Sequence, residues 1–183
     1  MLHVTKPTTK RGQATRSHIV DMAYQLCAEE GIRALRTRAV AVRAQVNVST
    51  LHYYFPTKHD LLLAVLEGLL ARFREKAPHV ATLSQELAEA VNSATRNPAM
   101  LAVWYDFWNL SRTDAEVHEM LRDHLEGWRR RLADLIRESH SSANATALLA
   151  LALGLPIVAF TLPQWWTADT LESSVAKWLR TEG

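Results

Sequence analysis

The chain of 183 residues is 48% hydrophobic and 22% charged, which supports one or two folded domains and argues against intrinsic disorder. Six glycines and six prolines disfavour a turn-rich all-β fold, and a single cysteine excludes an internal disulfide. The net charge of +2 is uneven: residues 1–60 carry nine Lys/Arg against four Asp/Glu, whereas the rest carries twelve against fifteen. This basic N-terminal third suggests a polyanionic partner.

The N-terminal segment is polar and basic. Residues 1–12 are predicted to form a flexible basic tail, and they lack the apolar run of a secretory signal, so we expect a cytoplasmic protein. Apolar residues at helical spacing predict a first helix from about Thr15 to Glu30, which Gly31 should end. The lone Cys27 lies on its apolar face and is predicted to be a small buried hydrophobe.

Two short helices should follow, at Thr37–Ala44 and Val48–Phe55, with only three residues between them. Pro56 closes the second helix. Thr57 and Asp60 have the spacing of a capping box, which predicts the start of a longer helix that continues to about Lys76. A short helix, a three-residue turn and a second short helix are typical of a helix-turn-helix, whose second helix enters the major groove of DNA.

The residue types within this motif support that interpretation. Ala41 and Ala44 are small enough for close helix crossing, Val46 and Leu51 should point inward, and Asn47 can cap the second helix. The residues then left outward, towards base edges, are Val48, Ser49 and Thr50. Donors suited to phosphates are His52, Tyr53, Tyr54 and Lys58, although both tyrosines could be core residues, as Phe55 should be.

Five further helices are predicted, at residues 82–95, 98–111, 114–139, 143–162 and 168–181. The apolar run Ala147–Leu162 is too short for a bilayer and contains Pro156, so we expect a buried helix and no membrane partner. The predicted fold class is all-α with about nine helices. Residues 13–73 would form a three-helix DNA-binding domain, and residues 74–183 a second helical domain.

The segment from Val46 to Phe55, followed by Pro56-Thr57-Lys58 and Leu61-Leu62, resembles the helix-turn-helix of the TetR family of bacterial repressors. Upstream, Ile19, Ala23, Gly31 and Thr37 stand where that family expects them, so the resemblance covers about residues 16–65. It implies a homodimer that binds a palindromic double-stranded DNA operator, and it implies that residues 74–183 serve dimerisation and effector binding. By motif position it implies DNA contacts from Thr37, Arg38, Val48, Ser49, Thr50, His52, Tyr53, Tyr54 and Lys58.

Two residues depart from the family pattern. Gln45 stands where the family usually has glycine in the turn; a left-handed conformation there would cost on the order of 1 kcal/mol. His52 replaces a common tyrosine, which puts one backbone contact in doubt. Val48 is apolar, so we expect it to contact a thymine methyl group rather than to form hydrogen bonds.

The C-terminal half suggests two further roles. Trp104, Phe107 and Trp108 share a helical face and either line a cavity for a small apolar or amphipathic effector or simply fill the core. Asp106 lies about 200° around that helix from Trp104 and should point elsewhere. A helix that is apolar on every side needs more cover than one short chain supplies, which predicts a dimer interface from Leu148, Leu151, Leu155, Val158, Leu162, Val175 and Trp178.

Other site classes find little support. His118 with Asp114 or Arg122 is weak evidence for metal, and we expect neither a metal nor a cofactor. The run from Arg129 to Arg131 is interpreted as a solvated face. Without a nucleophile–base pair or a glycine-rich phosphate loop, we do not expect an enzyme. A ligand-responsive repressor is therefore the leading hypothesis, and the alternatives are a constitutive DNA-binding protein or a helical enzyme or carrier.

Overall fold

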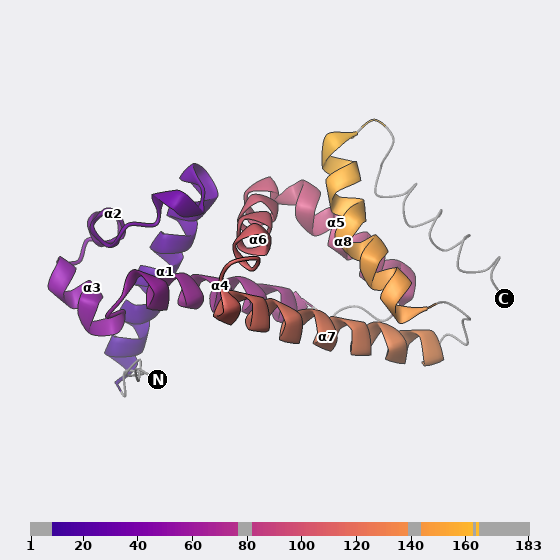
Figure 1. Ribbon diagram of the computed structural model, residues 1–183, viewed down its shortest axis with the longest axis horizontal. Coiled ribbons are helices and arrows are strands. Elements are labelled where there is room, and N and C mark those ends of the chain that lie inside the picture. The colour runs from indigo at the N-terminus through magenta and orange to yellow at the C-terminus, as the bar shows by residue number, and fades with distance from the viewer. Residues whose placement is uncertain (1–8, 77–81, 139–143, 163, 165–183) are drawn as a thin grey trace. The chain divides into compact units, whose positions relative to one another are not determined.

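The computed structural model describes residues 9–76, 82–138, 144–162 and 164, and this part of the chain is helical without strands (Figure 1). The elements in order are α1 (Lys10–Glu30), the 3-10 turn η1 (Ile32–Ala34), α2 (Thr37–Arg43), α3 (Val48–Tyr54), α4 (Lys58–Lys76), α5 (Leu83–Arg96), α6 (Pro98–Leu110), α7 (Ala115–Glu138) and α8 (Ala145–Thr161). The all-α prediction is confirmed. Eight of the nine predicted helices are present, and the ninth, at 168–181, lies outside the described residues.

The chain divides into two compact units, which are described separately. The first contains residues 1–72 together with 102–118, and the second contains residues 73–101 together with 119–183. Most of α6 and the start of α7 therefore belong to the first unit, although they are far from residues 1–72 in sequence. Among the described residues, no helix has the length and apolar character of a membrane span.

Helix α1 begins earlier than predicted. Thr9 caps it, since Thr9 Oγ1 accepts a hydrogen bond from Gly12 N at 3.1 Å. Lys10 and Arg11, which were expected in the tail, are thus helical. The predicted stop is confirmed: Gly31 has φ 81°, and its N–H donates to Cys27 O at 2.8 Å. A positive φ of this kind suits glycine because glycine lacks a Cβ atom.

The turn between α2 and α3 contains a left-handed residue. Gln45 has φ 54°, and the next residue, Val46, donates its N–H to Ala41 O at 3.0 Å. The departure from the family's glycine therefore falls on a position that does adopt the left-handed conformation, at a cost of about 1 kcal/mol. The chain keeps the turn geometry because the surrounding helices are well packed.

The core of the first unit holds the motif together. Leu51 and Phe55 are fully buried, whereas Val46 is only partly so; Ala41 and Ala44 are 2% and 3% exposed, as close helix crossing requires. The prediction that Phe55 is a core residue is confirmed. Each fully buried leucine or phenylalanine contributes about 1.5–3 kcal/mol of burial free energy. Other fully buried large side chains of this unit are Ile19, Leu35, Leu61, Leu66, Leu69 and Phe107.

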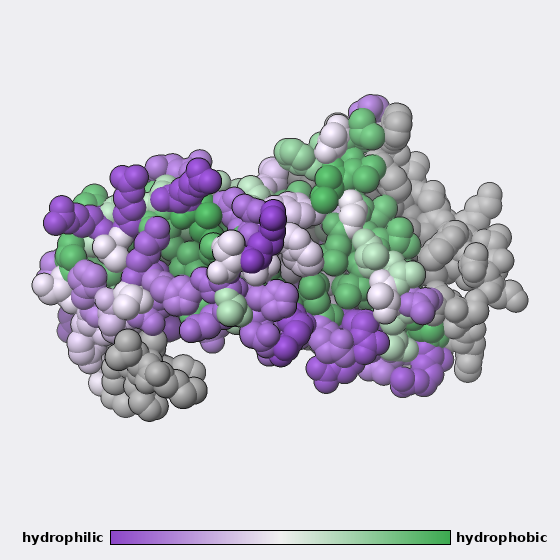
Figure 2. Space-filling view, viewed as in Figure 1, coloured by the Kyte–Doolittle hydropathy of each residue, from purple (hydrophilic) through white to green (hydrophobic). Residues whose placement is uncertain are grey.

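The second unit has its own core, in which α5 packs against α8. Its buried residues are Leu83, Leu87, Val91, Leu132, Leu135, Leu148, Ala152 and Ala159. Helix α8 continues through Pro156, and Asn144 caps its first turn. Four large apolar side chains of α8 remain exposed, namely Leu151, Ile157, Val158 and Phe160. Figure 2 shows hydrophobic residues gathered along this helix.

Candidate nucleic-acid interface

The second helix of the motif, α3, is capped as its sequence predicted. Asn47 Oδ1 accepts a hydrogen bond from Thr50 N at 2.6 Å, which satisfies one of the unpaired N–H groups of the first turn. On the opposite side, Leu51 is fully buried. The cap and this anchor leave Val48 37% exposed and Ser49 also exposed, while Thr50 is partly buried. The N-terminal end of α3 therefore presents short side chains to the solvent.

The remaining predicted contact residues differ in exposure. Arg38, His52 and Lys58 are exposed, and Thr37 is partly buried. The two tyrosines separate: Tyr53 is 66% exposed, whereas Tyr54 is only 9% exposed. Their rings meet edge to face with centroids 5.0 Å apart. Tyr53 is consequently the better candidate for a phosphate contact, and the role of Tyr54 stays a prediction.

The segment between α3 and α4 is tightly bonded. Thr57 N donates to Asp60 Oδ2 at 2.8 Å, and Asp60 N donates to Thr57 Oγ1 at 3.0 Å, so the predicted capping box is confirmed. Because a carbonyl can only accept, His52 Nδ1 donates to Pro56 O at 3.3 Å. Lys58 is the first residue of α4 and is held next to the C-terminal end of α3.

Helix α1 supports the motif through contacts that the sequence analysis missed. The Arg16 guanidinium lies over the Phe55 ring, 5.1 Å from its centroid. His18 Nε2 donates to Ala44 O at 3.2 Å, and Arg43 forms an ion pair with Glu29. Arg16 stands three residues before the buried Ile19, and this helical spacing was the available signal for an inward role.

Asp106 is a second missed residue. Its Oδ2 accepts a hydrogen bond from Ile32 N at 2.8 Å, just after the left-handed Gly31. Burial, and next the Asp106 carboxylate, raise the pKa of Cys27 to about 12. The thiol therefore stays protonated. Cys27 is also only 1% exposed, which agrees with the prediction of a small buried hydrophobe.

The aromatic residues of α6 are unequally buried. Trp104 is 6% exposed and Phe107 is fully buried, whereas Trp108 is 42% exposed. The rings of Trp104 and Trp108 lie with centroids 6.3 Å apart and tilted by 40°. The ligand role of these three residues remains a prediction.

The second unit contains a buried polar cluster. Glu86 is 8% exposed and accepts hydrogen bonds from Trp128 Nε1 at 2.7 Å and from Arg131 Nε at 3.1 Å. Beside it, the His124 ring lies between Phe73 and Trp128, with centroids 5.8 and 6.5 Å away. Burial, and secondarily the positive charge of Arg74, lower the pKa of His124 to about 4.

This cluster corrects one interpretation of the sequence. Arg131 was expected on a solvated face with Arg129, but it forms an ion pair with the buried Glu86, and its side chain is only 30% exposed. Arg129, by contrast, pairs with Glu126 of its own helix. The run of arginines is therefore partly structural, because one of its members neutralises a buried carboxylate.

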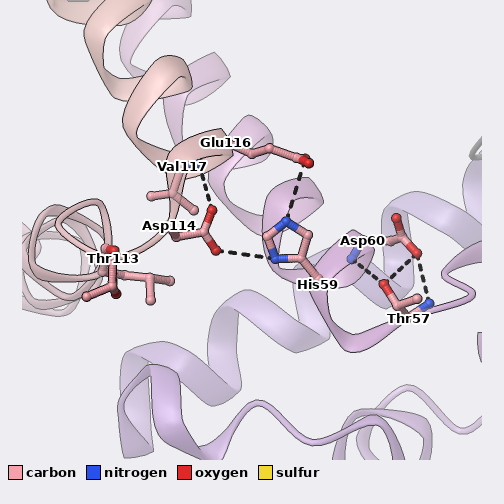
Figure 3. A network of polar contacts seen from close by, with 8 residues as sticks. Thr57, His59, Asp60, Thr113, Asp114, Glu116 and Val117 are labelled. Atoms are coloured by element: carbon pink, nitrogen blue, oxygen red, sulfur yellow. Dashed lines mark hydrogen bonds and ion pairs between the residues drawn. The ribbon is translucent and has the colours of Figure 1, made fainter. Parts of the chain in front are cut away.

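Charged groups also meet where α4 and α7 begin, within the first unit (Figure 3). His59 Nδ1 lies 3.4 Å from Asp114 Oδ2, and His59 Nε2 lies 3.5 Å from Glu116 Oε2. Asp114 also caps α7, since its Oδ1 accepts from Val117 N at 3.1 Å. Within the described part of the chain, no grouping of three His, Cys, Asp or Glu side chains is suited to hold a metal ion.

Comparison with known proteins agrees with this arrangement. Residues 19–65 match the model of the tetR family of bacterial regulatory proteins, and residues 78–182 match the model of the C-terminal part of BetI-type transcriptional repressors. The second match alone covers more than half of the chain. The chain belongs to the TetR family of transcriptional regulators.

Individual TetR-family relatives are distant. The transcriptional regulator BetI of Rhizobium meliloti is 26% identical over 114 residues, which are 58% of this chain and 56% of BetI. The match thus spans little more than half of that relative. Among solved structures, a TetR regulator from Haloarcula marismortui is 21% identical with a TM-score of 0.79, covering 92% of this chain and 98% of that one. A Saccharomonospora viridis regulator, solved in complex with choline, is 22% identical with a TM-score of 0.72, covering 91% and 96%.

Proposed function

We propose that this protein is a repressor that binds a double-stranded DNA operator through α3. The observation that carries the proposal is the capped, solvent-facing N-terminal end of α3 on a fully buried Leu51. In this arrangement Val48 reaches a thymine methyl group, while Ser49 and Thr50 supply hydroxyls for base edges. Side chains of this size allow the helix backbone to come close to the floor of the major groove.

Phosphate contacts would flank this reading helix. Thr37 and Arg38 lie at the start of α2, and Tyr53 and Lys58 lie at the other end of the motif. Contacts on both sides fix the register of α3 on the duplex without carrying sequence information. His52 is engaged with Pro56 O through Nδ1, so Nε2 is the nitrogen that would face DNA.

A palindromic operator requires a dimer, and we propose that α8 forms its interface. The exposed Leu151, Ile157, Val158 and Phe160 supply apolar area that a partner subunit would cover. Leu155 and Leu162 are partly buried and could extend the patch, whereas Leu148 is fully buried against its own chain. Val175 and Trp178, which were predicted to contribute, lie outside the described residues.

We further propose that a small apolar or amphipathic effector binds at α6 and weakens operator binding. The match to the BetI-type C-terminal model and the similar fold of a regulator solved with choline support this proposal. The aromatic residues Trp104, Phe107 and Trp108 are the candidates to contact it. Since operator DNA is the proposed partner, the protein would act in the cytoplasm.

The test is operator binding by fluorescence anisotropy, using DNA from upstream of the protein's own gene. Lys58→Ala should weaken binding to all DNA sequences alike. It should also reduce the slope of log affinity against log salt concentration by about 0.9 for each phosphate that is no longer neutralised. Thr50→Ala should instead relax base preference. Arg130→Ala, an exposed charge on α7, is the matched control.

The combined Thr37/Tyr53/Lys58 alanine variant gives the decisive result. It uses the exposed Tyr53 rather than the buried Tyr54, so that weaker binding does not reflect a failure to fold. Wild-type affinity in this variant, with native circular dichroism, would show that DNA binding lies elsewhere on the protein.

A further inference from the structure

His59 connects the DNA-binding motif to another helix. It is the second residue of α4, directly after Lys58, and its ring nitrogens lie 3.4 Å from Asp114 and 3.5 Å from Glu116 (Figure 3). Both carboxylates stand at the beginning of α7. The ring therefore links the segment that carries a proposed phosphate contact to the first turn of a 24-residue helix.

The chemistry of this contact depends on protonation. A carboxylate only accepts, so a nitrogen that faces it must carry a proton to be attracted to it. Neutral imidazole has one N–H, which leaves the second nitrogen with its lone pair towards the other carboxylate. Imidazolium has two N–H groups and a positive charge, and it alone satisfies both contacts at once.

The charges around the ring are few and well defined. From α7 it faces Asp114 and Glu116, and its neighbours on α4 are Lys58 and Asp60. The Asp60 carboxylate is bonded to Thr57 N and Oγ1 through Oδ2. Asp114 is 20% exposed and fixed by its capping bond, whereas Glu116 is 69% exposed, so solvent screens the second contact more. Asp114 is therefore the stronger partner.

We propose that His59 is a positioning residue that forms a proton-dependent clamp between the starts of α4 and α7. The protonated clamp holds the N-terminal end of α4, with Lys58, in the arrangement found here. Its stabilisation requires the charged imidazole, and it is lost when the ring releases its proton. Operator binding, on which this inference rests through the proposed function, should weaken with that loss.

The experiment compares the wild type with His59→Gln, which keeps a donor but never carries a charge. Operator dissociation constants are measured at pH 6.0 and pH 8.0 and constant ionic strength. We expect the wild type to bind about three- to fivefold more tightly than the variant at pH 6.0, and equally tightly at pH 8.0, which is the range for partly exposed ion pairs. Glu116→Gln should remove part of the pH 6.0 advantage.

Two controls isolate the clamp. His18 and His52 are identical in the two proteins, so any effect that they have on DNA binding cancels in the affinity ratio. His118→Gln, on the exposed face of α7, should behave as the wild type at both pH values. An affinity ratio between wild type and His59→Gln that is the same at pH 6.0 and pH 8.0 overturns the proposal.

A second readout separates this inference from the proposed function. The urea midpoint of the DNA-free protein should exceed that of His59→Gln by more at pH 6.0 than at pH 8.0. If the wild type binds no operator at either pH, the proposed function fails. The difference in urea midpoints then decides the clamp alone, and equal differences at both pH values overturn it.

Discussion

The Asp106 carboxylate on α6 accepts a hydrogen bond from the backbone N–H of Ile32, 74 positions earlier in the chain, at 2.8 Å. This bond fixes the connection between α1 and α2 immediately after Gly31, where α1 ends. An unpaired donor would otherwise remain at the first residue of η1. The α1–α2 connection thus depends on a side chain from outside the helix-turn-helix sequence.

Replacing Asp106 with alanine should destabilise the protein by about 1.5–3 kcal/mol, the contribution of a hydrogen bond to a charged group. Asp106→Asn keeps an acceptor oxygen and should lose less. Urea unfolding measures both free energies. Asp123→Ala, which removes an exposed carboxylate on α7, is the control. Equal stability of Asp106→Ala and the wild type would contradict the assigned role.

Gln45→Gly should stabilise the protein by roughly 0.5 kcal/mol, although it removes side-chain atoms. Glycine removes the left-handed strain of about 1 kcal/mol. Part of this gain is offset because glycine also increases the backbone entropy of the unfolded chain. Gln25→Gly, at an exposed position inside α1, should instead destabilise by about 1 kcal/mol. If Gln45 has the conformation described, the two variants should shift the thermal unfolding temperature in opposite directions.

His124 makes stability depend on pH. Its pKa is about 4 in the folded protein against an ordinary value of 6.5, so the unfolded state binds more protons between these values. The neutral ring therefore contributes stability that is present above about pH 6.5 and is lost as the pH falls towards 4, up to about 3 kcal/mol.

The His124→Gln variant should lack this contribution to the pH dependence, and His118→Gln should retain it. Urea midpoints between pH 4.5 and pH 7 measure the effect as a difference from the wild type. If the urea midpoints of the wild type and of His124→Gln change with pH in parallel, the ring is not held neutral by burial. The sign is opposite to that expected for the His59 clamp, which weakens as the pH rises.

Phe160→Arg should prevent the proposed dimer from forming, because it places a charge in the apolar face of α8 that a partner subunit would bury. Sedimentation velocity at micromolar concentration measures the change. Val42→Arg is the control, since Val42 is 80% exposed on α2 of the other unit. A wild-type protein that sediments as a monomer would defeat the proposed interface.

Local features of the motif could be predicted from the sequence because they depend on neighbouring residues. The caps at Asn47 and at Thr57 with Asp60 are satisfied within three residues. The left-handed Gln45 lies where the resemblance to the TetR family indicated a glycine in the turn. Gly31 ends α1 for the same kind of reason. Helix periodicity then gave the order of the helices and the buried Phe55.

Contacts between distant helices could not be predicted in this way. The pairing of Glu86 with Arg131 joins α5 to α7 across 45 positions, and Asp106 reaches Ile32 across 74. A charged residue in an amphipathic helix is expected to face solvent unless a partner on another helix is known. Which helices become neighbours is decided by packing of the whole core, and one sequence carries no direct record of it.

The inert state of Cys27 has a practical consequence for spectroscopy. The only thiol of the chain is buried and has a pKa of about 12, so maleimide reagents at neutral pH leave it unmodified. A cysteine introduced by Val42→Cys would then be the single reactive site in each subunit. In the proposed dimer, a pair of spin labels there would report the separation of the two helix-turn-helix motifs in solution, with and without the proposed operator.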